Sequence, residues 1–306
     1  MKKYVLGGLI GLYALTGCAK LENESFQNDK SGFPVKYTIS MSKEILPFIE
    51  TKAAPPLNIQ EPIETRNNGN DLYNRIDYLV FLADEDNQLL KQITYQTDDL
   101  DFGIVYDTLP AGNYNLCFIA HSSKDMTIEG QIAQFQDISD TFHHYKTLTV
   151  SPGNEITEEI TLQRVVGKIE FQATDPVPAD GKNFKMTITS PADKLDLTTG
   201  YGLTDDEPLI YDHTFTSEER GTTETTHGFL TFITNPGSML TAHLISYDQQ
   251  GEILRERLVE EISPIANRIT RYKGTLYTPQ NSDETFNIQI WNNGLWEKVD
   301  EQPLPE

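Results

Sequence analysis

The sequence has little cysteine and no apolar run long enough to cross a membrane. Cys18 and Cys117 are the only cysteines among 306 residues, which excludes the disulfide framework typical of small secreted domains. The longest apolar run, residues 4–15, falls short of the roughly 20 residues that a transmembrane helix needs. Nor does any segment show the periodicity of a long amphipathic helix. A chain of this length has room for about two domains of ordinary size. Since it lacks these features, we expect it to be built mainly from strands.

Positive charge is also scarce. The chain has 24 lysines and arginines against 46 aspartates and glutamates, which gives a formal net charge of −22. A surface this acidic repels phosphate backbones and anionic lipid headgroups. We therefore expect no nucleic-acid partner.

The sequence shows no spacing of residues that indicates an active site or a metal site. His143 and His144 are adjacent, so on a strand their side chains point to opposite faces and do not share a metal. The acidic runs 84–87 and 98–101 carry oxygen ligands that suit calcium, but without EF-hand spacing, and solvated turns explain them as well. We expect no enzyme, no cofactor and no metal. The remaining histidines are scattered and are expected at the surface or the edge of a core: His121, His213, His227 and His243.

The N-terminus, residues 1–17, has the pattern of a lipoprotein signal peptide. Two lysines precede the apolar run, and Leu-Thr-Gly-Cys at residues 15–18 matches a lipobox, which predicts cleavage between Gly17 and Cys18. Acyl chains on Cys18 would hold the mature protein to a membrane. An ordinary secretory signal with a coincidental cysteine is the alternative. Residues 18–34 are polar and are predicted to form a flexible linker.

The remainder of the chain alternates as strands do. Residues 76–82 and 89–95 flank an acidic turn and predict a hairpin, and residues 240–258 repeat that hairpin in outline. We predict an all-β protein with two β-sandwich domains, residues 35–163 and 164–306. Two segments have other expected forms. The best candidate for a short helix is 128–138, and the polar stretch 193–226 is expected to be a binding loop or a solvated insertion.

Several motifs resemble a known family. These are Glu-Thr-Arg at 64–66, Leu-Pro-Ala-Gly-Asn-Tyr at 109–114 and Leu-Gln-Arg-Val-Val-Gly-Lys-Ile at 162–169. They look like the fimbrillin superfamily of Bacteroidales, particularly its FimB-like anchor and accessory subunits. The resemblance implies two transthyretin-like, Greek-key sandwiches, a surface-exposed lipoprotein of the outer membrane, and partners that are other subunits of a type V pilus. Such subunits join by donor-strand exchange, in which main-chain pairing provides the affinity. A role in adhesion to a host or bacterial receptor would be compatible with this.

The resemblance leaves the kind of subunit open. Stalk precursors of the family are cut after an arginine, and Arg66 is the candidate for such a cut, unless it is simply an arginine in a loop. The tail 297–306 is charged and contains two prolines, which makes it a poor donor strand. We therefore favour an anchor or accessory subunit that stays lipidated. The alternative within the family is a polymerising or tip subunit activated by cleavage after Arg66.

A surface lipoprotein that binds glycans is the main alternative outside pili. Trp291 and Trp296 flank an Asn-Gly turn, and two rings held together in this way could stack on sugar faces. Large aromatic residues more often belong to a core or line a groove.

Overall fold

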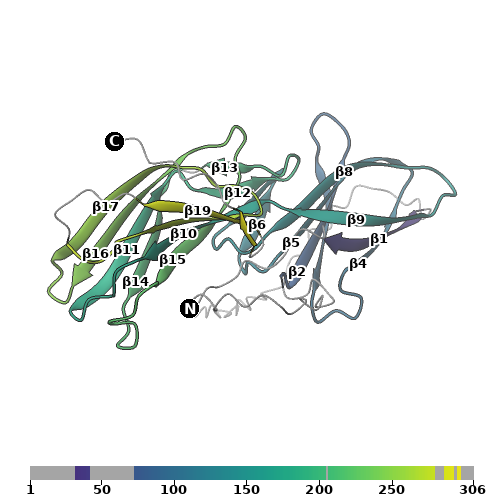
Figure 1. Ribbon diagram of the computed structural model, residues 1–306. Coiled ribbons are helices and arrows are strands. Elements are labelled where there is room, and N and C mark those ends of the chain that lie inside the picture. The colour runs from purple at the N-terminus through teal and green to yellow at the C-terminus, as the bar shows by residue number, and fades with distance from the viewer. Residues whose placement is uncertain (1–31, 42–71, 205, 280–285, 293–294, 298–306) are drawn as a thin grey trace, which may run out of the picture.

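The structure, a computed structural model, describes residues 32–41, 72–204, 206–279, 286–292 and 295–297. The described residues form strands and turns without a helix, which confirms the predicted all-β class. The strands form two sandwiches and a small sheet at the junction between them (Figure 1).

The first sandwich consists of two half-sheets that pack face to face. One half-sheet has the order β3-β2-β5-β8 and the other β9-β1-β4, and they are joined where Phe142 and His143 of β8 pair with β9. Alternate residues of each strand point inward and form a single core, with Tyr37, Tyr78 and Phe118 at its centre. The strands are β1 (Phe33–Met41), β2 (Arg75–Leu82), β3 (Leu89–Gln96), β4 (Ile104–Leu109), β5 (Gly112–His121), β8 (Phe142–Val150) and β9 (Ile156–Arg164).

The second sandwich packs the sheet β14-β11-β16-β17 against the sheet β15-β10-β18-β19-β20. Its core contains Phe171, Phe184 and Tyr277. The strands are β10 (Val166–Ala173), β11 (Gly181–Thr189), β14 (Leu209–Thr214), β15 (Thr226–Phe232), β16 (Leu240–Asp248), β17 (Ile253–Ile262), β18 (Ile269–Gly274), β19 (Asn287–Asn292) and β20 (Leu295–Glu297).

The two sandwiches share one strand order. In the first, β1 lies between the parallel strand β9 and the antiparallel strand β4. In the second, β10 lies in the same way between β18 and β15. The opposite sheets match as well, because β3-β2-β5-β8 corresponds to β14-β11-β16-β17 in chain order. The predicted division into domains 35–163 and 164–306 stays a prediction.

Each sandwich contributes one hairpin to the sheet at the junction. The first provides β6 (Met126–Glu129) and β7 (Ile132–Phe135), and the second provides β12 (Ala192–Asp196) and β13 (Gly202–Thr204). The hairpins meet where β7 pairs with β12. A third apolar cluster lies here and includes Phe81, Phe135, Leu195 and Phe232. The strands β9 and β10 also cross this junction, separated by Val165 alone.

Polar contacts reinforce the junction. The Arg164 guanidinium donates to both carboxylate oxygens of Asp140, at 2.7 and 2.6 Å, and to Asn267 Oδ1. His143 Nε2 donates to the carbonyl oxygen of Leu197 at 2.8 Å. Asp140 and His143 belong to the first sandwich, whereas Leu197 and Asn267 belong to the second, so both contacts cross between them.

The two predicted hairpins are confirmed as β2-β3 and β16-β17. The predicted helix at 128–138 is wrong: this segment lies in β6 and β7, where Ala133 and Phe135 alternate inward at a spacing of two residues. The segment 193–226 is not a single loop, because it includes most of β12 and all of β13 and β14. The predicted linker, 18–34, overlaps the start of β1, since Phe33 and Pro34 pair with β4.

Candidate functional site

The most distinctive site in the molecule is the place that β1 occupies between β9 and β4. Residues Val35–Met41 pair in parallel with Ile156–Leu162, and Phe33–Thr38 pair antiparallel with Leu109–Ile104. β1 is therefore bonded along both sides, although it comes from the N-terminal end of the chain. The groove between β9 and β4 is filled by a segment that lies far from both strands in the sequence.

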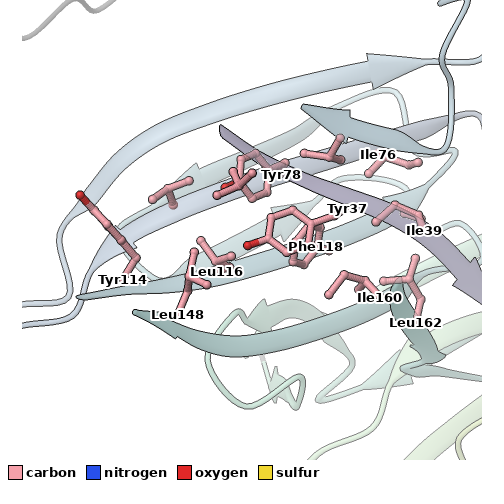
Figure 2. Close-up of a cluster of buried hydrophobic side chains, with 14 of the residues drawn as sticks. Tyr37, Ile39, Ile76, Tyr78, Tyr114, Leu116, Phe118, Leu148, Ile160 and Leu162 are labelled. Atoms are coloured by element: carbon pink, nitrogen blue, oxygen red, sulfur yellow. The ribbon is translucent and has the colours of Figure 1, made fainter. Parts of the chain in front are cut away.

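Three side chains anchor β1 in the core. Val35, Tyr37 and Ile39 alternate inward and are 2%, 0% and 9% exposed. The Tyr37 ring lies edge-on to Phe118, with 5.2 Å between centroids, and 6.2 Å from the ring of Tyr78. Figure 2 shows these rings together at the middle of the core, with Ile39 farther along β1. Such edge contacts between aromatic rings add to the gain from burial alone.

The hydroxyl of Tyr37 is buried at a cost. Burial raises the pKa of Tyr37, and the negative charges of Glu158 and Asp107 raise it further, so the phenol stays neutral. Within the described part of the chain, its oxygen has no hydrogen-bond partner. A buried polar group without a partner costs about 1–3 kcal/mol. The position of β1 is thus stabilised by apolar burial and ring packing, not by this hydroxyl.

β4 is held on its other side without help from β1. Lys91 of β3 forms an ion pair with Asp107 of β4, with 2.6 Å between Nζ and Oδ1. The Tyr95 hydroxyl, also on β3, accepts from the amide of Tyr106 at 3.3 Å and donates to its carbonyl at 3.2 Å. These contacts join the open edges of the two half-sheets. They fix one wall of the groove that β1 fills.

Three of the sequence-predicted site residues lie outside the described residues: Gly17 and Cys18 at the expected signal cleavage, and Arg66 at the expected protease site. Their order along the chain still bears on the site. β1 lies between Cys18 and Arg66, so it stays attached to Cys18 if the chain is cut after Arg66. Such a cut would therefore separate β1 from the rest of the sandwich.

Trp291 and Trp296 are brought opposite one another. They are paired residues in the register of β19 and β20, as the Asn-Gly turn between them predicts. β19 extends the sheet of the second sandwich beyond β18, to which it is antiparallel. The main chain thus places these two residues side by side as cross-strand neighbours.

The histidines are less dispersed than expected, because the rings of His213 and His227 lie 5.3 Å apart, and two of them are more deeply buried than expected. His143 and His144 occupy opposite faces of β8, with bonds to Leu197 O and Thr161 O respectively. His121 and His227 lie inside the protein rather than at a core edge. Within the described ranges, no three His, Cys, Asp or Glu residues are grouped as a metal would require. The same ranges contain no helix long and apolar enough to span a membrane.

The acidic runs form capped turns. Asp84 Oδ1 accepts from the amide of Asn87 at 2.9 Å, and Asp99 Oδ2 accepts from the amide of Gln96 at 2.7 Å. Such bonds are the ordinary role of aspartate in turns. Cys117 is a free thiol within the core, and burial raises its pKa.

The sequence analysis did not predict which strands border the groove. The alternation of residues 35–40 is typical of a strand, but no local pattern indicates that its neighbours are β4 and β9. An inward lysine on β3 and an inward aspartate on β4, Lys91 and Asp107, were the available sign, because charges that interrupt an apolar face often pair with one another.

Comparison with known proteins gives a family and a fold. The sequence profile of the fimbrillin-A associated anchor proteins Mfa1 and Mfa2 matches residues 63–301. No curated protein matches the sequence.

Among solved structures, a candidate adhesin from Bacteroides ovatus is 11% identical, with 89% of this chain and 99% of that chain covered and a TM-score of 0.54. A candidate polysaccharide-binding protein from Bacteroides thetaiotaomicron is 12% identical, with 89% and 100% covered and a TM-score of 0.53. The fimbrial anchor protein Mfa2 from Porphyromonas gingivalis is 12% identical, with 87% and 98% covered and a TM-score of 0.49. At these identities, the first two share the fold of this chain.

Proposed function

The chain belongs to the family of fimbrillin-A associated anchor proteins, and from that premise we propose that it is a lipid-anchored anchor or accessory subunit of a fimbria. In this proposal, acylated Cys18 holds the protein in the outer membrane, and other fimbrial subunits join it by strand pairing. The proposal includes a role in adhesion, which the protein would perform as part of the fimbria.

The observation that carries the proposal is the position of β1, which is paired with β9 on one side and β4 on the other. In an uncut chain, the groove between β9 and β4 is filled from within by residues 33–41. A subunit whose groove is filled by its own strand does not accept the strand of a neighbour there. It can therefore end a polymer but not extend it through this groove, which is what an anchor requires.

The position of β1 in the sequence fits attachment to a membrane. The lipobox cysteine precedes β1, and the polar residues 19–32 lie between them. As long as the chain is uncut, the lipid and the strand are parts of one covalent segment. Anchoring and closure of the groove are then linked, because both depend on the same piece of chain.

Cleavage after Arg66 would give the alternative function. It would leave β1 on a separate fragment, and loss of that fragment would expose the groove to the strand of another subunit. The same fold would then act as a polymerising or tip subunit. The two functions therefore differ in one property that can be measured, the N-terminus of the native chain.

Glycan binding is kept as a second candidate because Trp291 and Trp296 are cross-strand neighbours. One structure with the same fold is described as a candidate polysaccharide-binding protein. If the tryptophans bind sugar, Trp296→Ala abolishes retention on a glycan column and leaves membrane attachment unchanged.

The deciding experiment is the intact mass and N-terminal sequence of protein purified from its native outer membrane, with identification of the proteins that co-purify. An acylated N-terminus at Cys18 together with fimbrial subunits supports the proposal. A chain that begins at Asn67 overturns it in favour of polymerisation, and an acylated chain accompanied only by glycan-uptake proteins favours sugar binding. In a matched variant, Cys18→Ala should release the folded protein from the membrane, whereas Cys117→Ala should not.

A further inference from the structure

We propose that the first sandwich is a mechanical clamp that carries tension between the membrane and any load held by the second sandwich. The inference rests on the proposed attachment through Cys18. It goes beyond that attachment, because it concerns how the fold resists a pulling force. Strand directions, the packing of β1 and the contacts at the junction carry it.

The force enters and leaves one strand pair at opposite ends. A tether at Cys18 pulls on the first residue of β1, Phe33. A load on the second sandwich pulls on the last residue of β9, Arg164, because only Val165 separates it from β10. β1 and β9 are parallel, so the start of β1 lies beside the start of β9. In Figure 1, β9 runs from the first sandwich toward the second with β1 next to it.

This geometry loads the pair in shear. When parallel strands are pulled from opposite ends, the hydrogen bonds along the pair share the force and must break together. When adjacent ends are pulled apart, the bonds break one after another at a lower force. Seven residues of β1 pair with β9, and six pair with β4 on its other side. Because β1 is a central strand, sliding it breaks both ladders at once.

The side chains of β1 also oppose sliding. A slip of one residue would turn Val35, Tyr37 and Ile39 toward solvent and bring the exposed Thr38 toward the core. A slip of two residues would restore the alternation but move the Tyr37 ring away from Phe118. Neither shift preserves the packing of the core. The native register of β1 is therefore the one that resists a pulling force.

The junction passes the force to the second sandwich. Arg164, the last residue of β9, is bonded to Asp140 on one side and to Asn267 on the other. Close by, His143 is bonded to Leu197 O. These contacts act in parallel with the covalent link through Val165. Tension is thus shared across the junction instead of falling on one residue.

Single-molecule force spectroscopy tests the clamp on the mature chain, residues 18–306, produced without lipid. The thiol of Cys18 is one attachment point, and the buried Cys117 does not compete. The second point is a cysteine at either of two exposed turn positions, Ala179→Cys or Glu155→Cys. Pulling between 18 and 179 loads β1 against β9 in shear. Pulling between 18 and 155 peels the same strands apart from adjacent ends.

We expect the shear geometry to unfold at a clearly higher force than the peeling geometry at equal loading rate, because both ladders of β1 must break together in shear; forced unfolding is governed by the unfolding rate. Equal forces in the two geometries would overturn the clamp. This comparison uses the native side chains, so it does not depend on a core variant that folds.

A second comparison tests the role of the packed side chains. Ile39→Val should lower the shear force and leave the peeling force nearly unchanged, whereas Thr38→Ala, on the outer face of the same strand, should change neither. An equal effect of both variants would contradict the packing argument. Failure of the clamp is distinguishable from failure of the proposed anchor, because these measurements use protein without lipid and the anchor is tested by the N-terminus of native protein.

Discussion

The imidazole of His121 donates from Nε2 to Asp77 Oδ2 at 3.0 Å, in a pair of side chains that are both fully buried. The other ring nitrogen, Nδ1, accepts the amide of Ser123 at 3.1 Å, which fixes the proton on Nε2 in the neutral ring. Arg75 adds two hydrogen bonds to the same carboxylate. His121, Asp77 and Ser123 are the residue types of a catalytic triad. Here, however, Ser123 bonds to the imidazole through its main-chain amide and not its hydroxyl, so the arrangement does not activate a nucleophile and instead stabilises the strand.

Asp77 should make the fold sensitive to acid. Burial by itself raises the pKa of this carboxyl, but hydrogen bonds from His121, Arg75 and Thr94 outweigh burial, and the pKa lies well below its ordinary value of 3.8. A lowered pKa in the folded state contributes stability above the ordinary value, and this contribution is lost as the pH falls below it. Urea unfolding at pH 3 and pH 6 should therefore show a smaller pH difference for Asp77→Asn than for the wild type.

The same variant should be unstable at neutral pH. Removing the charge leaves the Arg75 guanidinium without its buried counter-charge, and such losses cost about 3–5 kcal/mol. Asp86→Asn, on an exposed turn, is the control and should change little. A neutral-pH stability of Asp77→Asn equal to that of the wild type would contradict the role assigned to this carboxylate.

His143 should make the stability of the fold depend on pH in a higher range than Asp77 does. Burial lowers its pKa from 6.5 to about 4, despite the bond to Leu197 O. The neutral ring is favoured in the folded state, so its contribution to stability is complete above pH 6.5 and is lost as the pH falls toward 4. The melting temperature of His143→Gln should vary less than that of the wild type between pH 6.5 and 4. The exposed His243→Gln should follow the wild type, and parallel curves for all three proteins would refute the prediction.

Gly200 should not tolerate a side chain. Its φ is +73°, and a Cβ there would lie 2.7 Å from Nδ1 of His143. Gly200→Ala should destabilise the protein by about 1–3 kcal/mol from backbone strain, with a further loss from displacing the histidine. Gly153 has a similar φ of +81° but open space around it, so Gly153→Ala should carry the backbone cost alone. Chemical denaturation of the two variants separates the clash from the strain.

Removing the hydroxyl of Tyr37 should not destabilise the protein. Because that oxygen is buried and without a hydrogen-bond partner among the described residues, Tyr37→Phe should leave the free energy of unfolding unchanged or raise it by up to about 2 kcal/mol. Tyr37→Ala removes the ring and should cost about 3–5 kcal/mol. A clear loss of stability in Tyr37→Phe would show that the hydroxyl is bonded in solution.

The sequence predicted features set by neighbours along the chain. Alternation between 76 and 95, and again between 240 and 258, identified both hairpins because their strands are joined by short turns. The residues Leu-Pro-Ala-Gly at 109–112 are likewise typical of a local turn, and they connect β4 to β5. Where register depends on a turn of a few residues, local patterns suffice.

Distant pairings could not be predicted in this way. The segment 128–138 reads as a short helix because Ile128, Ile132 and Phe135 lie at helical spacing, whereas burial against Leu195 and Phe232 selects a hairpin. The partners of β1 lie more than 60 residues away in the sequence, so no local pattern names them. The repeat was found but assigned to the wrong counterpart, since β16-β17 corresponds in strand order to β5-β8 and not to β2-β3.

The shared strand order also bears on ancestry. Two sandwiches with the same order and directions, joined head to tail, are what duplication of one ancestral unit would leave. The hairpins β6-β7 and β12-β13 interrupt that order at different points, between β5 and β8 in one unit and between β11 and β14 in the other. Among the described strands, neither hairpin has a counterpart in the other unit, yet they pair with each other. The sheet at the junction is therefore built from the two segments in which the units differ, whereas the two cores are built from the strands that they share.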